Sequence, residues 1–191
     1  MLDLKKGKEL VRLARKAVET RRIWKFGKDL KVKKGVFVTI ETYPEKELRG
    51  CIGFPYPIYP LGEGVQKAAI AAAYEDPRFE PLEKEELNKV CFEASVLTEP
   101  ELIQVKSPKE YFEKIEPGKD GLILQNGPFS GLFLPQVWKH FPKVEDFLEN
   151  LCFKANLTPD YLYDKNTKIY RFRAQIFAEK KPKGEVIEIQ L

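Results

Sequence analysis

The stretch KELRGCIGFPYP, residues 46–57, decides the fold because it joins a strand pattern to a stiff connection. Successive side chains of a strand point to opposite faces. The sequence therefore predicts a core face formed by Leu48, Gly50, Ile52 and Phe54, and a functional face formed by Glu47, Arg49, Cys51 and Gly53. Prolines at 55, 57 and 60 then favour an extended segment.

Arg49 and Cys51 suggest a chemical site on the second face. An arginine two residues along a strand, roughly 6–7 Å away, favours the thiolate and so lowers the pKa of the cysteine. Gly53 has no side chain, which leaves space for a ligand or another backbone segment. Such a thiolate fits a nucleophile, a redox centre or part of an anion pocket. The alternative is a cysteine that packs as a small hydrophobic residue.

The neighbouring segments predict a hairpin followed by a helix. GVFVTIE, residues 35–41, alternates in polarity and is expected to pair with residues 47–54 through a turn around Tyr43 and Pro44. PLGEGVQKAAIAAAYED, residues 60–76, is expected to form a helix whose alanines permit close packing on a sheet. Pro77 ends this helix because proline disfavours helical geometry at the preceding residue.

Two carboxylates, Glu75 and Asp76, lie at the C-terminal end of that helix, where the helix dipole disfavours negative charge by about 0.3–1 kcal/mol. Either Arg78 or Arg49 pairs with them structurally, or they serve binding or proton transfer. The predicted site therefore has Cys51 as its candidate catalytic residue, and its candidate binding residues are Arg49, Gly50, Gly53, Glu75, Asp76 and Arg78.

The rest of the chain predicts an α+β protein. Helices are expected at about residues 4–22 and 144–155, and a capping box at 107–110 opens a short helix. Further strands are expected at 89–97, 168–179 and 185–191, with two more around an Asn-Gly turn in 121–135. This mixture favours a mixed, largely antiparallel sheet flanked by helices. We expect a single domain over residues 1–191, with a larger subdomain and a smaller lobe at about 100–165.

Composition and charge limit the class of protein. No apolar run approaches the roughly 20 residues that span a bilayer, and Cys51, Cys91 and Cys152 form no CxxC, so a reducing, cytoplasmic setting is expected. The 32% of charged residues predicts a thermophilic source. Residues 1–34 hold thirteen Lys or Arg and four acids, a local charge of +9 that leaves −5 for the remainder. Such asymmetry indicates nucleic-acid or acidic-partner binding, or simply a solvated first helix.

Other chemical signatures are weak. His140 is the single histidine, and a dyad with Cys51 competes with the simpler interpretation of a surface residue in WKHFP. One histidine and three scattered cysteines lack the spacing of metal ligands. No phosphate-binding or dinucleotide-binding pattern follows a strand. We therefore expect neither a metal nor a cofactor.

Six blocks in a fixed order resemble the AMMECR family: LRGCIG, AAAYEDPRF, SVLTEPE, GKDGLIL, GLFLPQV and FLENLCFKANL. The resemblance covers about residues 35–178, and LRGCIG is the hallmark of the family. The family pattern maps onto Leu48–Gly53, Glu75–Phe79, Gly118–Gly121, Leu134–Gln136 and Leu151–Ala155, while His140 lies outside it.

The resemblance implies an α+β fold with a larger and a smaller subdomain, in a cytoplasmic protein of the AmmeMemoRadiSam system protein A type. It further implies an association with Memo-like and radical SAM proteins, and no particular reaction. Three functions follow from the residues and the resemblance together. The first is binding of a ligand or partner protein in a cleft lined by the LRGCIG strand. The second is a cysteine-dependent enzyme using Cys51 with Arg49, and the third is nucleic-acid binding by the basic N-terminal region.

Overall fold

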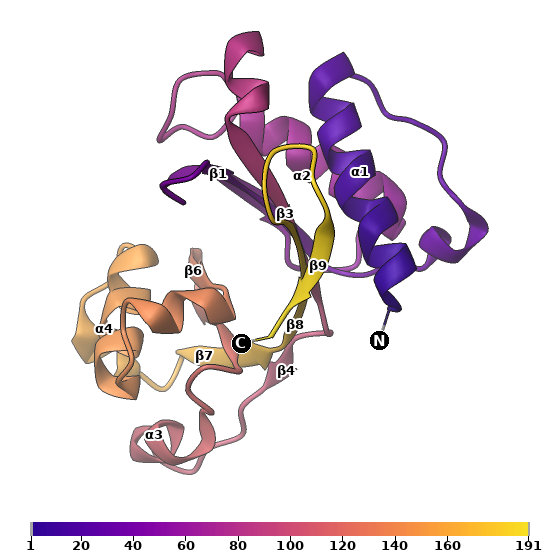
Figure 1. Ribbon diagram of the computed structural model, residues 1–191. Coiled ribbons are helices and arrows are strands. Elements are labelled where there is room, and N and C mark those ends of the chain that lie inside the picture. Colours follow the sequence, from indigo (N-terminus) through magenta and orange to yellow (C-terminus); the bar gives the residue numbers. More distant parts are fainter. Residues whose placement is uncertain (1, 191) are drawn as a thin grey trace. The chain divides into compact units, whose positions relative to one another are not determined.

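The fold is α+β, and the computed structural model describes residues 2–190. The chain forms two compact units (Figure 1). Unit 1 comprises residues 2–99 together with 175–190, and unit 2 comprises residues 100–174. Each unit has its own sheet and its own hydrophobic core.

Unit 1 is built on a five-stranded sheet with the strand order β2-β1-β3-β8-β9. Its strands are β1 (Val36–Thr42), β2 (Leu48–Phe54), β3 (Val90–Leu97), β8 (Ala174–Glu179) and β9 (Val186–Ile189). The pairs β1–β2, β1–β3 and β8–β9 are antiparallel. The hairpin expected around Tyr43 and Pro44 is therefore present, with β2 at the edge. The final strand was expected to reach Leu191, which lies outside the described residues.

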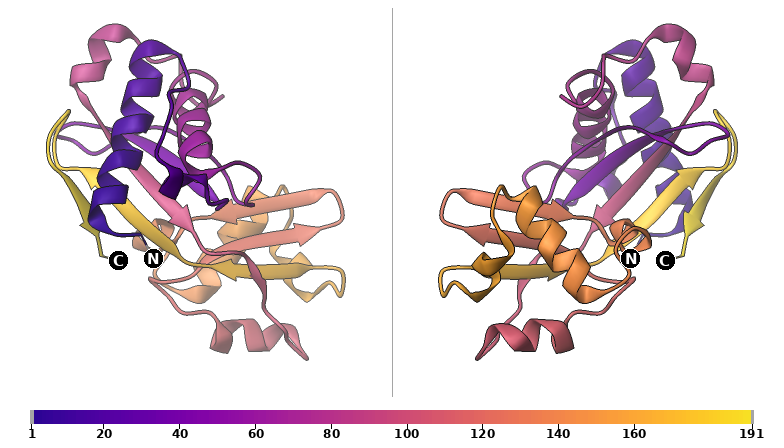
Figure 2. Two further views of the ribbon diagram at one scale, coloured as in Figure 1. Left: turned by 90° about the vertical axis from the view of Figure 1, so that its right-hand side faces the viewer. Right: turned by 90° about the vertical axis from the view of Figure 1, so that its left-hand side faces the viewer.

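Two helices, α1 (Leu4–Thr20) and α2 (Leu61–Tyr74), pack on one face of this sheet (Figure 2). The alternation of β1 explains why, because Val36, Val38 and Ile40 are fully buried and belong to the same core cluster as the apolar sides of both helices. The alanines of α2 contribute to this core. Helix α1 was expected to end near residue 22 but ends at Thr20, where Arg21 adopts a left-handed conformation (φ 52°).

A buried ion pair ties α1 to the sheet of unit 1. Arg15 is 6% exposed, and its Nε donates to Glu179 Oε1 of β8 over 2.7 Å. The same guanidinium donates to the carbonyl oxygens of Leu87 (2.9 Å) and Val90 (2.7 Å). Glu179 Oε2 also accepts from the Phe92 N–H at 3.0 Å. Two elements that are distant in sequence are thus joined through fully paired charges.

Unit 2 has a four-stranded antiparallel sheet with the order β4-β7-β5-β6. Its strands are β4 (Glu101–Leu102), β5 (Gly121–Asn126), β6 (Phe129–Phe133) and β7 (Lys168–Phe172). Its helices are α3 (Tyr111–Lys114) and α4 (Val144–Lys154). Trp138 stacks on Phe147 of α4 with 3.8 Å between the ring centroids, at the centre of this second core.

The prediction of one strand over residues 168–179 is wrong. The chain leaves β7 after Phe172 and begins β8 at Ala174, and these two strands belong to different sheets. Arg173 separates them, and residues 166–174 belong to unit 2 although the smaller lobe was expected to end at about 165. Because apolar alternation continues on both sides of Arg173, polarity alone did not reveal the break.

Candidate functional site

Cys51 lies at the middle of the edge strand β2, on the face turned away from α1 and α2. Its partner in β1 is Thr39, and the partner of Thr39 in β3 is Glu93, so the three side chains form a row across three strands. Thr39 Oγ1 lies 3.3 Å from Cys51 Sγ, within hydrogen-bonding reach for sulfur. The neighbouring row holds Gly53 and Ser95, and Ser95 Oγ donates to Glu93 Oε1 over 3.4 Å. We call Cys51, Thr39 and Glu93 the thiol row.

The backbone of Cys51 is held by the segment that follows α2. Its N–H donates to Asp76 Oδ2 over 2.9 Å, and its carbonyl oxygen accepts from Arg78 Nη2 over 3.2 Å. Edge strands expose backbone groups that invite pairing with other chains. Asp76 and Arg78 therefore satisfy both outward-facing backbone groups of the motif cysteine.

Asp76 and Arg78 form an ion pair with two parallel contacts. Arg78 Nε donates to Asp76 Oδ1 (2.9 Å), and Arg78 Nη2 donates to Oδ2 (2.7 Å). Burial by itself works to raise the pKa of Asp76, but the hydrogen bonds from Arg78 and from the Cys51 N–H outweigh it and hold that pKa at about 2. Of the two pairings expected from the sequence, Arg78 is the observed partner. Glu75 is exposed, whereas Asp76 is 4% exposed.

Asp76→Asn is expected to lower the free energy of unfolding by about 2 kcal/mol near neutral pH. The pKa of Asp76 falls from an ordinary 3.8 to about 2 on folding, so its contribution is complete above about pH 4 and is lost as the pH falls towards 2. Urea unfolding of both proteins across this range measures the effect. The difference should disappear near pH 2, and a difference that does not depend on pH would contradict the assignment. Glu75→Gln, at the exposed neighbour, is the control and should change stability by less than about 0.5 kcal/mol.

Arg49 does not act on the thiol as the sequence predicted. Its Nε and Nη2 donate to the two carboxylate oxygens of Glu86 at 2.8 and 3.0 Å, and its Nη1 donates to the Glu80 carbonyl oxygen at 3.0 Å. Glu86 also accepts from the Glu83 N–H, as part of the capping box of the short helix Lys84–Asn88. Arg49 therefore fixes this helix to β2.

The pKa of Cys51 is raised rather than lowered. Burial is the largest cause. The hydrogen bond with Thr39 and the charge of Arg78 lower the pKa, whereas the charges of Glu93 and Asp76 raise it. The predicted activation by Arg49 is thus wrong, because the cation that acts on this half-buried thiol is Arg78, which is itself neutralised by Asp76.

Comparisons with known proteins point to the same family as the hexapeptide LRGCIG. The family model described as AMMECR1 matches residues 11–177 of this chain. The chain belongs to the AMMECR1 family. It is 49% identical to the protein MJ0810 of Methanocaldococcus jannaschii, over all of this chain and 98% of that protein. It is 50% identical to a protein of Thermococcus gammatolerans, over 94% of this chain and 93% of the relative.

A solved structure of this AMMECR1 family has the same fold. The crystal structure of the uncharacterized protein PH0010 from Pyrococcus horikoshii superposes with a TM-score of 0.94 at 46% identity, covering 100% of this chain and 99% of that one. These relatives are archaeal. The thermophilic source expected from composition remains a prediction that their organisms favour.

The two glycines of the AMMECR1 hexapeptide pack against protein atoms. A Cβ added at Gly50 would lie 2.1 Å from the carbonyl oxygen of Ala72 in α2. One added at Gly53 would lie 2.3 Å from the Phe37 ring and 2.4 Å from the Val36 carbonyl oxygen, both in β1. Of the two uses expected for Gly53, close approach of another backbone segment is observed, and β1 occupies the space that a ligand would need.

The remaining candidates for chemistry are Cys91, Cys152 and His140. Cys91 is half-buried and Cys152 is buried, and burial raises the pKa of each thiol to about 11. His140 is an exposed residue of unit 2. Across residues 2–190, no three His, Cys, Asp or Glu side chains converge to hold a metal ion. In the same residues, no helix has the length and apolar character needed to cross a membrane.

Sequence reasoning missed Thr39 as a member of the site. It identified the polar face of β2 that carries Cys51, but not the polar residue of the strand paired with it. Thr39 is the polar residue in the middle of GVFVTIE and faces away from Val38 and Ile40. The alternation of that strand, combined with the expected pairing, was the signal that could have found it.

Proposed function

We propose that this protein binds a ligand or a partner protein on the sheet face that carries the thiol row, and that Cys51 contacts the bound group without forming a covalent bond to it. The observation that carries this proposal is that both arginines near Cys51 are committed to carboxylates, while its half-buried thiol is in a hydrogen bond with Thr39 and burial raises the pKa of that thiol. A cysteine nucleophile needs a thiolate, favoured by a nearby unpaired cation or a base. Here Arg49 is paired with Glu86, and Arg78 with Asp76.

The chemistry of this face suits a hydrogen-bond acceptor on the bound molecule. Cys51 presents an S–H group, and the side chain of Arg78 is 44% exposed. Arg78 uses Nε and Nη2 in its contacts with Asp76 and Cys51, and within residues 2–190 its Nη1 donates no hydrogen bond. A carbonyl or carboxylate group of a peptide or small molecule fits these donors.

At neutral pH, Cys51 is expected to react with iodoacetamide more slowly than free glutathione, because burial raises the pKa of its thiol and so lowers the fraction present as thiolate. Its rate should rise with pH as the thiolate forms, and the midpoint of that rise should lie above that of free glutathione. Mass spectrometry of the alkylated, folded protein measures each cysteine separately. Cys51→Ser is the matched control that identifies its peptide.

A kinetic pKa well below 9 at Cys51 would instead support the cysteine-dependent enzyme. Binding itself is tested on the isotope-labelled protein by screening small carboxylates and peptides in amide NMR spectra. Binders should shift the amide signals of Thr39, Cys51 and Glu93, and Cys51→Ser should keep the binding. Binders that shift amide signals in another part of the protein instead would contradict the proposed site. Memo-like and radical SAM proteins, which the family resemblance implies, are the first protein partners to test by chromatography of purified mixtures.

A further inference from the structure

The first 34 residues carry a positive charge that their own acids do not cancel. All four acids are engaged: Asp3 and Asp29 with Lys6 (3.9 and 3.5 Å), Glu19 with Lys183 (3.3 Å), and Glu9 with the Gly27 N–H (3.3 Å). Within residues 2–190, no carboxylate lies within ion-pair distance of the exposed cations Lys5, Arg12, Arg22, Lys25 and Lys28. We call these five residues the basic strip.

The basic strip belongs to two segments that run side by side in opposite directions. After α1, the Arg22 N–H donates to the Ala17 carbonyl oxygen, and Lys16 lies over the Trp24 ring at 3.5 Å. Further along, Gly27 contacts Glu9 and Asp29 contacts Lys6. These contacts move steadily back towards the start of α1 as the chain advances. Cations of α1 and of the returning segment 21–29 therefore lie on two neighbouring segments of unit 1.

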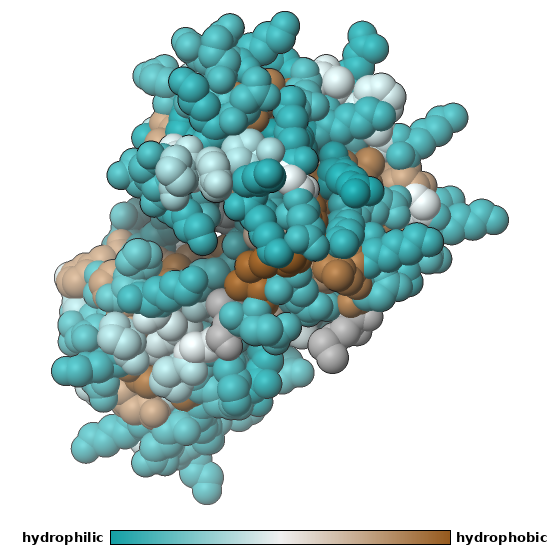
Figure 3. Space-filling model, in the orientation of Figure 1, coloured by the Kyte–Doolittle hydropathy of each residue, from teal (hydrophilic) through white to brown (hydrophobic). Residues whose placement is uncertain are grey.

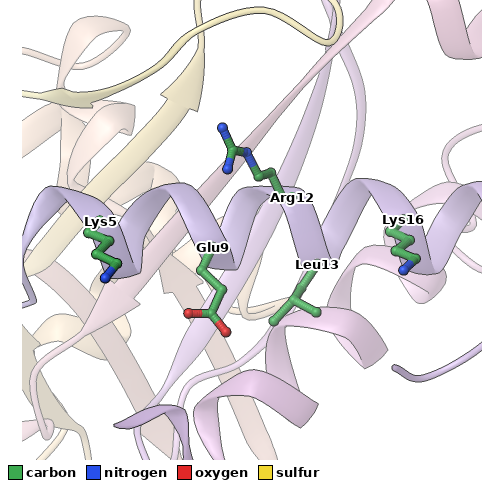
Figure 4. A pocket seen from close by; sticks show the side chains of 5 residues that line it. All are labelled: Lys5, Glu9, Arg12, Leu13 and Lys16. Atoms are coloured by element: carbon green, nitrogen blue, oxygen red, sulfur yellow. The ribbon is translucent and has the colours of Figure 1, made fainter. Parts of the chain in front are cut away.

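This side of unit 1 also has a shallow depression. It has a volume of about 310 Å³ and is lined by Lys5, Glu9, Arg12, Leu13 and Lys16. Figure 4 shows Glu9 and Leu13 extending from one side of α1 and Arg12 from the other. Figure 3 shows mostly hydrophilic side chains projecting on the right of the view, where α1 and the returning segment lie. Three cations thus line the depression, together with the Glu9 carboxylate and the apolar Leu13.

An aromatic residue sits among these cations. Trp24 is 37% exposed, and its backbone is fixed by Gln66, which accepts from the Trp24 N–H (2.7 Å) and donates to the Trp24 carbonyl oxygen (3.0 Å). The indole Nε1 donates to Thr20 Oγ1 over 2.8 Å. Neighbouring Ile23 is 45% exposed. Trp24 is thus an ordered aromatic platform with Lys16 over its ring.

We infer that the basic strip and Trp24 bind single-stranded nucleic acid, a function separate from the site around Cys51. Phosphates spaced along a strand match cations spread over two segments, and a base can stack on the Trp24 indole ring once the exposed, flexible Lys16 side chain moves off it. An acidic protein would match the charge but gives no reason for a fixed, exposed tryptophan among the cations. The tertiary structure also argues against insertion of α1 into a membrane surface, since its apolar side is buried in the core of unit 1.

The test is fluorescence anisotropy of the full chain with labelled DNA and RNA oligonucleotides of about 15 nucleotides. Binding should weaken steeply with salt, with a slope of log affinity against log salt between about −2 and −4 for three to five phosphate contacts. Trp24→Ala should weaken binding roughly tenfold. The triple variant Arg22→Glu, Lys25→Glu, Lys28→Glu should weaken it at least roughly 30-fold.

The matched control is a triple variant in unit 2, Lys109→Glu, Lys139→Glu, Lys143→Glu, at three exposed lysines. It changes the net charge of the protein by the same amount as the first triple variant. This control should retain binding within roughly threefold. An equal loss in both triple variants would overturn the assigned surface. An oligonucleotide affinity that does not change with salt concentration would also overturn it, and so would an absence of binding at low salt. Binding to phosphatidylserine vesicles without oligonucleotide binding, or self-association through the basic strip, would assign the surface to a lipid or to a second copy instead.

Discussion

Gly50→Ala is expected to destabilise the protein by about 3 kcal/mol or more, a large part of the 5–15 kcal/mol that holds a typical domain together. The new methyl group would lie 2.1 Å from the Ala72 carbonyl oxygen and 3.0 Å from its carbonyl carbon. Both atoms belong to the backbone of α2, which cannot rotate away as a side chain can. Relief requires that α2 move off the sheet, and Asp76, just beyond the end of α2, would move with it.

Guanidinium chloride unfolding of Gly50→Ala measures this loss. The control is Gly27→Ala, where the nearest atom would be Glu9 Oε1 at 3.5 Å and the backbone φ of −64° suits alanine. That variant should unfold within about 0.5 kcal/mol of the wild type. If Gly50→Ala is equally stable, α2 does not pack on β2 as closely as these distances require. The glycine of the family hexapeptide is then needed for another reason.

Local rules predicted much of unit 1. Alternation in residues 47–54 separated the side of β2 that packs with α2 from the side that carries Cys51. A carboxylate that conflicts with a helix dipole needs a compensating cation, and Arg78, two residues from Asp76, supplies it. In both cases the deciding partners lie within a few residues or follow from the period of a strand.

Non-local pairing limited the prediction of the site. The sequence offered Glu75 and Asp76 as partners for Arg49, but its partner is Glu86, 37 residues away, in the capping box of the helix Lys84–Asn88. Gly53 faces Phe37 because of the hairpin register, and alternation of polarity alone leaves that register open. The thiol row likewise exists only when three strands are aligned. Predicting residue types on one strand was possible, while predicting what occupies the space beside them was not.

Arg15→Met is expected to lower the free energy of unfolding by about 3–5 kcal/mol. The loss would leave the Glu179 carboxylate buried without its cation, because the Glu179 side chain is only 4% exposed. It would also remove the donors to the carbonyl oxygens of Leu87 and Val90. Lys6→Met is the matched control: its ion pairs with Asp3 and Asp29 are partly exposed, so it should cost less than about 1 kcal/mol.

The double variant Arg15→Met, Glu179→Met separates the loss of the pair from the cost of an isolated charge. With both charges gone, no unpaired charge is buried, and the double variant should be more stable than Arg15→Met alone by about 1–3 kcal/mol. Recovery should be incomplete, since the Phe92 N–H would lose its Glu179 acceptor. Chemical unfolding of the four proteins in this cycle gives the coupling energy. Equal stability of the single and double variants would mean that the isolated carboxylate costs nothing, and hence that water reaches Glu179 once Arg15 is removed.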